Sequence, residues 1–425
     1  MMSILALIIA GCLVAFSQST EYINTFVIIS IFIFSGAFFF DIRQISAYKK
    51  YGVPLSAGYL FRILLLFYDV YTNNPLHLPL VGGALSSDHL RFYNAAVGYT
   101  QGVETNYGGF FPRLLGAIFS ITGISRLWAE FIVMVFSIFT ILVFTRIIDD
   151  LDIPVIYRRA GVYLICLLPN YAFLSAVLRR ETFITFFVAL STKYFINWIR
   201  GKGENKAFIL AIVFAMGASL FHGATGLIIL CYIFIRLIYS PMRKAYTLEI
   251  KNILGALIFF VAFLFIYAKF GDVFFGKIDS KLSSGVYSVT RDAGRTSYAK
   301  YVGDAKTPLR MIIFAVPRFL YFMFSPFPWQ WRGLSDVITF LFSSCVYLYI
   351  ILSAVQYIRR SDKSDENRSI VIALLVVVLL GAEVFAWGTT NTGTATRHRD
   401  KFIVIYAILF SISQSTGGRL RLKHD

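Results

Sequence analysis

The chain has 425 residues, of which 57% are hydrophobic and only 15% are charged. Soluble domains of this length have roughly 45–50% apolar residues, so the composition excludes a water-soluble protein and predicts a polytopic membrane protein. Most of the Lys and Arg behind the net charge of +17 lie in short connections between apolar runs, which indicates cytoplasmic anchoring and no nucleic-acid partner. The four cysteines lie in apolar segments without paired spacing, so neither disulfides nor a metal site is expected.

The apolar runs predict an all-α fold of about twelve transmembrane helices in a single domain over 1–425. The run 207–238 would make one helix of about 48 Å against a hydrocarbon core of about 30 Å. We therefore expect a hairpin there, turning near His222. The expected spans are 3–17, 24–40, 57–71, 127–148, 161–178, 182–199, two within 207–238, 252–270, 336–358, 369–388 and 401–415.

The connections predict the orientation of these helices. The segments 41–56, 149–160 and 200–206 carry clustered Lys and Arg, so we expect them in the cytoplasm together with both termini. Two long outer loops result, 72–126 and 271–335. Each contains an apolar stretch, 110–121 and 311–327, that we expect to be interfacial or re-entrant. If 311–327 crossed the membrane instead, every later segment would invert and the basic loop 359–368 would lie outside.

The first outer loop places Asp88 beside His89, followed by Arg91. A carboxylate and an imidazole on an external loop are typical of a general base that removes a proton from a sugar hydroxyl. The alternative is structural, because Asp88 or Ser87 can cap a helix that begins near Leu90.

A tight outer turn carries Arg179, Arg180 and Glu181 between two spans. Charges at this position either pair with one another or bind an anion. His222 lies within the hydrophobic run 207–238, where it is either a catalytic group or a packing residue.

The last outer turn contains Arg397, His398 and Arg399 after a run of small residues, which we place at the start of a helix. Backbone NH groups and guanidinium groups there can bind a phosphate, whereas the alternative is interfacial snorkelling. The segment 324–331 predicts a rigid aromatic turn because it contains two prolines. Its Trp329 and Trp331 are candidate platforms for sugar rings or simple interfacial anchors.

Three stretches between 107 and 399 resemble bacterial Wzy-type polysaccharide polymerases, in particular the EpsG-like branch, which share architecture with GT-C glycosyltransferases. These stretches are YGGFFP at 107–112 followed by Gly-Ile-Ser at 123–125, the segment from LRRE at 178–181 through Lys193 and Trp198 to His222, and the turn 391–399. The chain departs from the Arg-x10-Gly pattern of some O-antigen polymerases, because neither Arg180 nor Arg291 has a glycine eleven positions later.

The resemblance implies a GT-C-like fold and transfer of a glycan between undecaprenyl-diphosphate carriers at the outer face of the bacterial cytoplasmic membrane. It implies no cofactor, nucleotide sugar or required metal. The expected partners are the lipid-linked donor and acceptor and the bilayer, with a flippase and a chain-length regulator as further candidates. The polymer would be a capsule, exopolysaccharide or O-antigen.

In the resulting hypothesis Asp88 accepts the hydroxyl proton, with His222 as an alternative base. Arg180, Arg397 and Arg399 neutralise the departing diphosphate. The segment 86–89 also resembles the first external loop of GT-C transferases, so a transferase with a polyprenyl-monophosphate sugar donor is an alternative. A lipid-linked oligosaccharide flippase is another, although the polar groups are predicted at helix ends and no internal repeat is evident.

Overall fold

The computed structural model describes residues 2–17, 21–79, 87–103, 107–246, 254–255, 258, 296–303, 308–362 and 365–421. The chain is mainly helical and divides into two compact units, Met1–Asp150 with Arg158–Phe186 and Leu151–Tyr157 with Phe187–Asp425. Within the described residues, six helices are long and apolar enough to cross a membrane, which agrees with the prediction of an all-α membrane protein. The predicted span 252–270 and much of the outer loop 271–335 lie outside the described residues.

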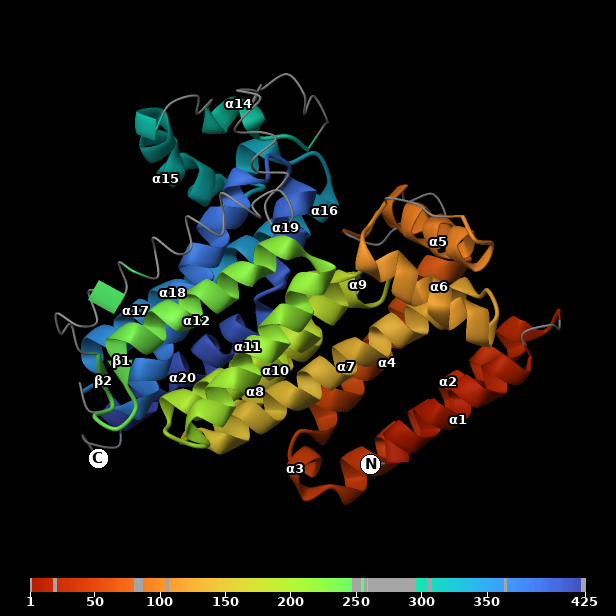
Figure 1. Cartoon of the computed structure of the whole chain (residues 1–425), viewed down its shortest axis with the longest axis horizontal. Helices are drawn as coiled ribbons and strands as arrows, with labels where there is room; N and C mark the ends of the chain where they lie inside the picture. The colour runs from red at the N-terminus through yellow and green to blue at the C-terminus, as the bar shows by residue number, and fades with distance from the viewer. Residues whose placement is uncertain are drawn as a thin grey trace. The chain divides into compact units, whose positions relative to one another are not determined.

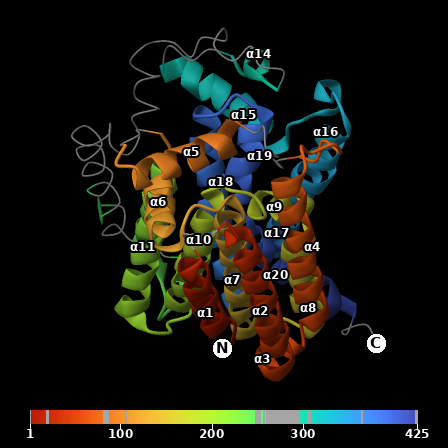
Figure 2. The same cartoon turned by 90° about the vertical axis from the view of Figure 1, so that its right-hand side faces the viewer.

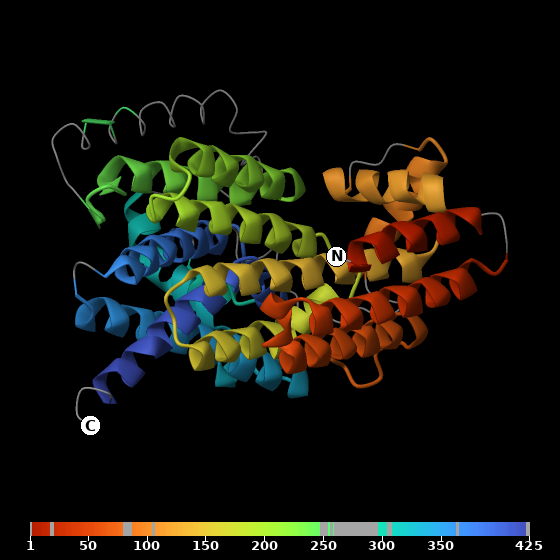
Figure 3. The same ribbon diagram turned by 90° about the horizontal axis from the view of Figure 1, so that it is seen from below.

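The first unit begins with a pair of helices, α1 (Met2–Phe16) and α2 (Ile23–Gln44), which run side by side (Figure 3). Asp41 near the end of α2 accepts hydrogen bonds from the hydroxyl and the backbone NH of Ser3, at 2.6 and 2.9 Å. The short helix α3 (Ser46–Lys49) leads to α4 (Gly52–Tyr71), which packs against α7 (Arg126–Asp150). These long apolar helices agree with the predicted spans in this part of the chain.

The outer loop of the first unit contains two helices, α5 (Ser87–Thr100) and α6 (Phe110–Thr122), which pack on each other. Figures 1 and 2 show α5 lying crosswise near the ends of α4 and α7. The apolar stretch 110–121 is therefore helical, and its re-entrant character stays a prediction. As a result, the first turn of α5 lies beside the last turn of α4.

The prediction of one continuous helix over 161–178 is wrong. The structure has two helices here, α8 (Val155–Leu167) and α9 (Pro169–Ser175), separated by Leu168, whose backbone is not helical. Pro169 causes the break, because it has no NH to donate to the carbonyl of Ile165 and disfavours helical geometry in the residue before it. After α9 the chain turns into α10 (Glu181–Ile199).

In the second unit the predicted hairpin within 207–238 is confirmed. Helix α11 (Glu204–Phe221) ends at His222, whose backbone is extended, and a 3₁₀ turn η1 (Gly223–Gly226) leads into α12 (Leu227–Ile238). The two helices lie against each other (Figure 1). A two-residue strand pair, β1 (Tyr239–Ser240) and β2 (Ala245–Tyr246), follows.

The rest of the second unit surrounds α18 (Glu366–Trp387), which contacts α12, α15 (Pro308–Phe324), α17 (Val346–Arg360) and α20 (Ile403–Arg421). The apolar stretch 311–327 is thus mostly helical. Two segments, α16 (Leu334–Thr339) and the π-helical η4 (Phe340–Cys345), continue directly into α17. The unit also contains the short helices α14 (Ala299–Val302) and α19 (Thr392–Asp400).

Candidate functional site

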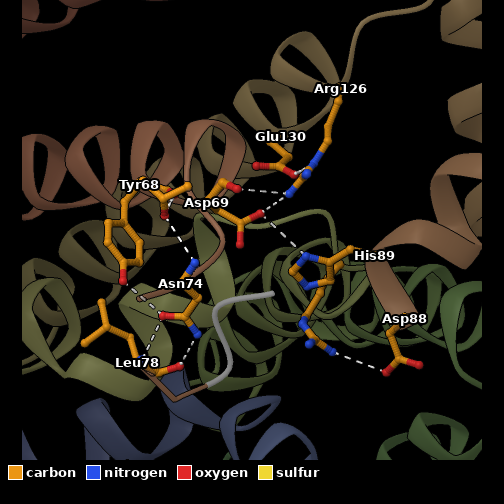
Figure 4. Close-up of polar contacts among 10 residues, drawn as sticks. Tyr68, Asp69, Asn74, Leu78, Asp88, His89, Arg126 and Glu130 are labelled. Carbon is orange, nitrogen blue, oxygen red and sulfur yellow. Dashed lines mark hydrogen bonds and ion pairs between the residues drawn. The ribbon is translucent and has the colours of Figure 1, made fainter. Parts of the chain in front are cut away.

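A buried ionic cluster, formed by Asp69, His89, Arg126 and Glu130, lies in the first unit (Figure 4). The Arg126 guanidinium pairs through Nη2 with Oδ2 of Asp69 and through Nε with Oε1 of Glu130, the latter at 2.7 Å. Both carboxylates are fully buried. Such groups are costly in an apolar protein unless they are paired or perform a function.

The helices explain why these groups meet. Asp69 lies in the last turn of α4, and Arg126 is the first residue of α7, with Glu130 four residues further on the same face. Because α4 and α7 pack together, the end of one places Asp69 beside the beginning of the other. The first turn of α5 then adds His89 to the cluster.

The environment of His89 is unusual for an imidazole. Its side chain is only 2% exposed, and Nδ1 lies 3.6 Å from Oδ2 of Asp69, which is too long for a hydrogen bond. Within the described residues neither ring nitrogen has a hydrogen-bond partner. Burial and the nearby Arg179 guanidinium lower the pKa of His89 to about 4, so the ring is neutral at physiological pH.

Asp88 faces a different set of groups from His89. Its carboxylate accepts a hydrogen bond from the Tyr107 hydroxyl at 3.3 Å and pairs with Arg179 at 3.5 Å. The side chain remains 31% exposed. Consecutive residues of a helix point about 100° apart, so the predicted Asp88–His89 constellation does not form as a pair. Among the described residues of this outer loop, Asp88 is a carboxylate that remains partly exposed.

The other predicted residues of the first unit have separate contacts. Arg180 lies 3.4 Å from the carbonyl oxygen of Gly108 and above the Phe92 ring. Arg91 is exposed and stacks on Tyr107, the residue that donates to Asp88. Glu181 is buried as the first residue of α10, where an acidic group favours the helix N-terminus.

In the second unit the structure brings two predicted histidines together. The rings of His222 and His398 lie 5.1 Å apart, and both contact Phe385. Lys401 lies above the same Phe385 ring and donates to Nδ1 of His398 at 2.7 Å. The Phe385 ring therefore contacts three polar side chains, those of His222, His398 and Lys401.

The prediction that Arg397, His398 and Arg399 begin a helix is wrong. Helix α19 begins at Thr392 after Asn391, whose side chain accepts from the backbone NH of Thr394 at 3.2 Å, and the three basic residues fall in its last turn. Asn is a favoured N-cap, and cations are favoured near a helix C-terminus. The guanidinium groups and the free NH groups therefore lie at opposite ends of this helix.

The two arginines of this turn differ in environment. Arg397 is partly exposed and lies 3.5 Å from the hydroxyl of Thr394. Arg399 is fully buried and donates to the carbonyl oxygens of Met323 and Ser325. The second arginine thus anchors the segment 323–325.

The predicted aromatic turn over 324–331 is present. A 3₁₀ turn, η3 (Pro328–Gln330), follows Phe327, whose ring stacks on Trp329 with centroids 4.7 Å apart. The Trp331 indole NH donates to the carbonyl oxygen of Pro326 at 3.1 Å. Trp329 is exposed, so its ring remains available to a ligand or an interface.

Sequence reasoning missed Asp69, Arg126 and Glu130. The signal that could have found them is the occurrence of ionisable residues at the ends of otherwise apolar spans, since such residues are expensive in a membrane and are usually functional. Their pairing depends on the α4–α7 contact, which the sequence does not reveal.

The predicted catalytic residues divide between the two units, with Asp88 and Arg180 in the first and His222 and Arg397 in the second. No known protein family, curated protein or solved structure matches this chain.

Proposed function

We propose that this chain is a glycosyltransferase of the bacterial cytoplasmic membrane that polymerises undecaprenyl-diphosphate-linked oligosaccharide repeat units into a surface polysaccharide at the outer face. The proposal includes a GT-C-like arrangement of about twelve spans with both termini in the cytoplasm. It is supported by the apolar helices, by the resemblance described above and by polar groups at the end of the first unit.

The observation that carries the proposal is the environment of Asp88. A partly exposed carboxylate that is oriented by a hydroxyl and a guanidinium can accept a proton from an acceptor hydroxyl. Arg180 follows Arg179 directly, so a second guanidinium is available for a phosphate near this carboxylate.

We assign the larger part of the rate enhancement to stabilisation of the negative charge on the departing diphosphate. A diphosphate is a good leaving group, so arginines that neutralise it lower the barrier more than proton transfer does. In this proposal Arg180 and the partly exposed Arg397 are each, within their own unit, a candidate partner of a phosphate group. His398 follows Arg397 directly in the chain, and its ring lies 5.1 Å from that of His222. Arg399 is assigned to the packing of its turn, because it is fully buried and both of its terminal nitrogens donate to carbonyl oxygens of the segment 323–325.

Replacement of Arg397 tests the assignment directly. We expect Arg397→Ala to abolish polymer at a normal protein level, because a diphosphate would lose a charge-assisted partner. Arg332→Ala is the control, since Arg332 pairs with Asp336 one helical turn away and has no assigned role. Polymer of unchanged chain length in the Arg397 variant would contradict the proposal.

The function itself is tested by deleting the gene in its native host and analysing lipid-linked glycans and surface polymer by mass spectrometry. Accumulation of one complete repeat unit exposed at the outer face would support the polymerase. A repeat unit that lacks one sugar would instead indicate the single-sugar transferase, and complete units trapped inside would indicate a flippase.

A further inference from the structure

We propose that Asp69, His89 and Glu130 bind one divalent transition-metal ion, Mn²⁺ or Zn²⁺. One carboxylate oxygen from each acid and one imidazole nitrogen lie within 4.8 Å of one another, and all three side chains are buried. The proposal does not depend on the proposed glycosyl transfer, and it departs from the expectation that no metal is present.

The orientation of His89 is the observation that points to a ligand. Its ring is buried, yet neither nitrogen has a hydrogen-bond partner in the described part of the chain, and Nδ1 faces Oδ2 of Asp69 (Figure 4). Leaving a buried polar atom unsatisfied costs roughly 1–3 kcal/mol. An imidazole nitrogen with an available lone pair is the group that coordinates a metal.

The distance between the donor atoms of His89 and Asp69 is close to that expected for two ligands of one ion. Ligand atoms about 2.1 Å from a tetrahedral metal lie about 3.4 Å from each other. The 3.6 Å between Nδ1 of His89 and Oδ2 of Asp69 is close to that value. Oε2 of Glu130 is buried without a hydrogen-bond partner in the described residues, so it is available as a third ligand.

Arg126 is compatible with a bound ion. It donates to Oε1 of Glu130 and leaves Oε2 to the ion, and it also donates to Oδ2 of Asp69. A carboxylate oxygen can accept more than one contact, so the Arg126 bonds do not prevent coordination. Such outer contacts orient metal ligands. The Arg126 guanidinium faces two carboxylates, and the nearby Arg179 guanidinium pairs with Asp88, so an added cation interacts favourably with Asp69 and Glu130.

The identity of the ion follows from the donor set. Imidazole favours transition metals, whereas carboxylates also suit Mn²⁺, so a mixed set with one nitrogen fits Mn²⁺ or Zn²⁺ better than Mg²⁺ or Ca²⁺.

The test uses the full chain, purified with an affinity tag that lacks histidine, stripped of metal and titrated with Mn²⁺ under electron paramagnetic resonance. We expect one bound Mn²⁺ per chain, displacement by Zn²⁺, and an electron spin-echo modulation from one coordinated imidazole nitrogen. The last signal is recorded on the unmodified protein, so the test does not depend on whether a variant folds.

Substitutions then locate the ion. His89→Ala should remove the nitrogen signal and weaken Mn²⁺ binding by roughly tenfold or more, and Glu130→Gln should weaken binding while the nitrogen signal is kept. His77→Ala is the matched control, because His77 is exposed in the loop after α4. Absence of stoichiometric Mn²⁺, or a nitrogen signal that survives in His89→Ala or disappears in His77→Ala, would overturn the proposal. The polymer assay on Arg397→Ala is independent of each of these outcomes.

Discussion

Arg62 is fully buried in α4, and its guanidinium is satisfied by uncharged oxygens. It donates to the carbonyl oxygens of Cys166 and Gly58, at 2.7 and 3.0 Å, and to the hydroxyl of Ser175 at 2.9 Å. A longer contact of 3.4 Å reaches the carbonyl oxygen of Ile165. Because α8 ends at Leu167 and the next helix begins with proline, the last carbonyl groups of α8 lack intrahelical donors. Arg62 supplies donors at this break.

We therefore expect Arg62→Met to lower the stability of the protein by about 3 kcal/mol, since several buried acceptors lose their donor. The measurement is thermal or denaturant unfolding of the purified protein in detergent. Arg159→Met provides the comparison, because Arg159 is exposed and donates only to the carbonyl oxygen of Lys50 among the bonds of the described chain; it should change stability by less than about 0.5 kcal/mol. Equal effects of the two substitutions would refute the proposed role of Arg62.

At the scale of single residues, the sequence predicts only part of the candidate site. Asp88 and His89 were recognised as chemically informative, but their adjacency in the sequence suggested a pair that the helix separates. Asp69 and Glu130, which are 61 positions apart in the sequence, share one guanidinium in the structure. Spacing along a chain predicts proximity only within one helix, whereas this cluster depends on helix packing.

At the scale of elements, the packing of α4 on α8 depends on the absence of a side chain at Gly58. A Cβ atom at this position would lie 2.8 Å from Cβ of Cys166 and 3.2 Å from its carbonyl oxygen. That carbonyl is the one that accepts from Arg62 at 2.7 Å. The small residue therefore allows the approach on which the Arg62 contacts depend.

Gly58→Ala should destabilise the protein by about 1–3 kcal/mol, because the helices must separate and the Arg62 contact to Cys166 lengthens. Gly36→Ala in α2 is the matched control: no heavy atom of the described structure lies within 4 Å of the new Cβ, and alanine favours a helix by up to about 1 kcal/mol. Both are measured by unfolding in the same detergent. A Gly58 variant as stable as the Gly36 variant would show that the close approach is unimportant.

The sequence predicts helix boundaries correctly where the length of an apolar run and its basic flanks decide them. It predicts them wrongly where a proline or a capping residue decides them. The turn at His222 followed from the length of the apolar run and the basic residues at its two ends. The break at Pro169 is a local signal too, because proline disfavours a helix interior, but the apolar pattern of 161–178 does not show it. The predicted start of the helix at Arg397 is too late, because Asn391 caps the helix and the basic residues fall in its last turn.

At the scale of the whole molecule, the distribution of charge in the first unit predicts its orientation in the membrane. Lys50 and Arg158 both pair with Asp149 near the beginning of α4 and the end of α7. The buried ionic cluster lies at the other end of the same two helices. Basic connections favour the cytoplasm, so the end that carries the cluster is expected to face outward.

Cysteine labelling checks this orientation. In a background with Cys12 and Cys345 replaced by alanine, Val103→Cys should react with a membrane-impermeant maleimide in intact spheroplasts. Arg159→Cys should react only after permeabilisation. Both new positions are exposed, while Cys166 and Cys231 are buried, so they give little background. Labelling of Arg159→Cys in intact spheroplasts would show that the first unit has the opposite orientation.

The sequence by itself determined that this is a helical membrane protein, because long apolar runs have few structural solutions in a bilayer. It also located most helices, since hydrophobicity and basic flanks are local properties. Only the tertiary structure decided that Asp69, His89, Arg126 and Glu130 form one cluster and that Asp88 turns away from His89. Contacts between helices depend on side-chain shape across the packed surfaces, such as the space that Gly58 leaves for Cys166, and the apolar pattern of a single helix does not encode its partner.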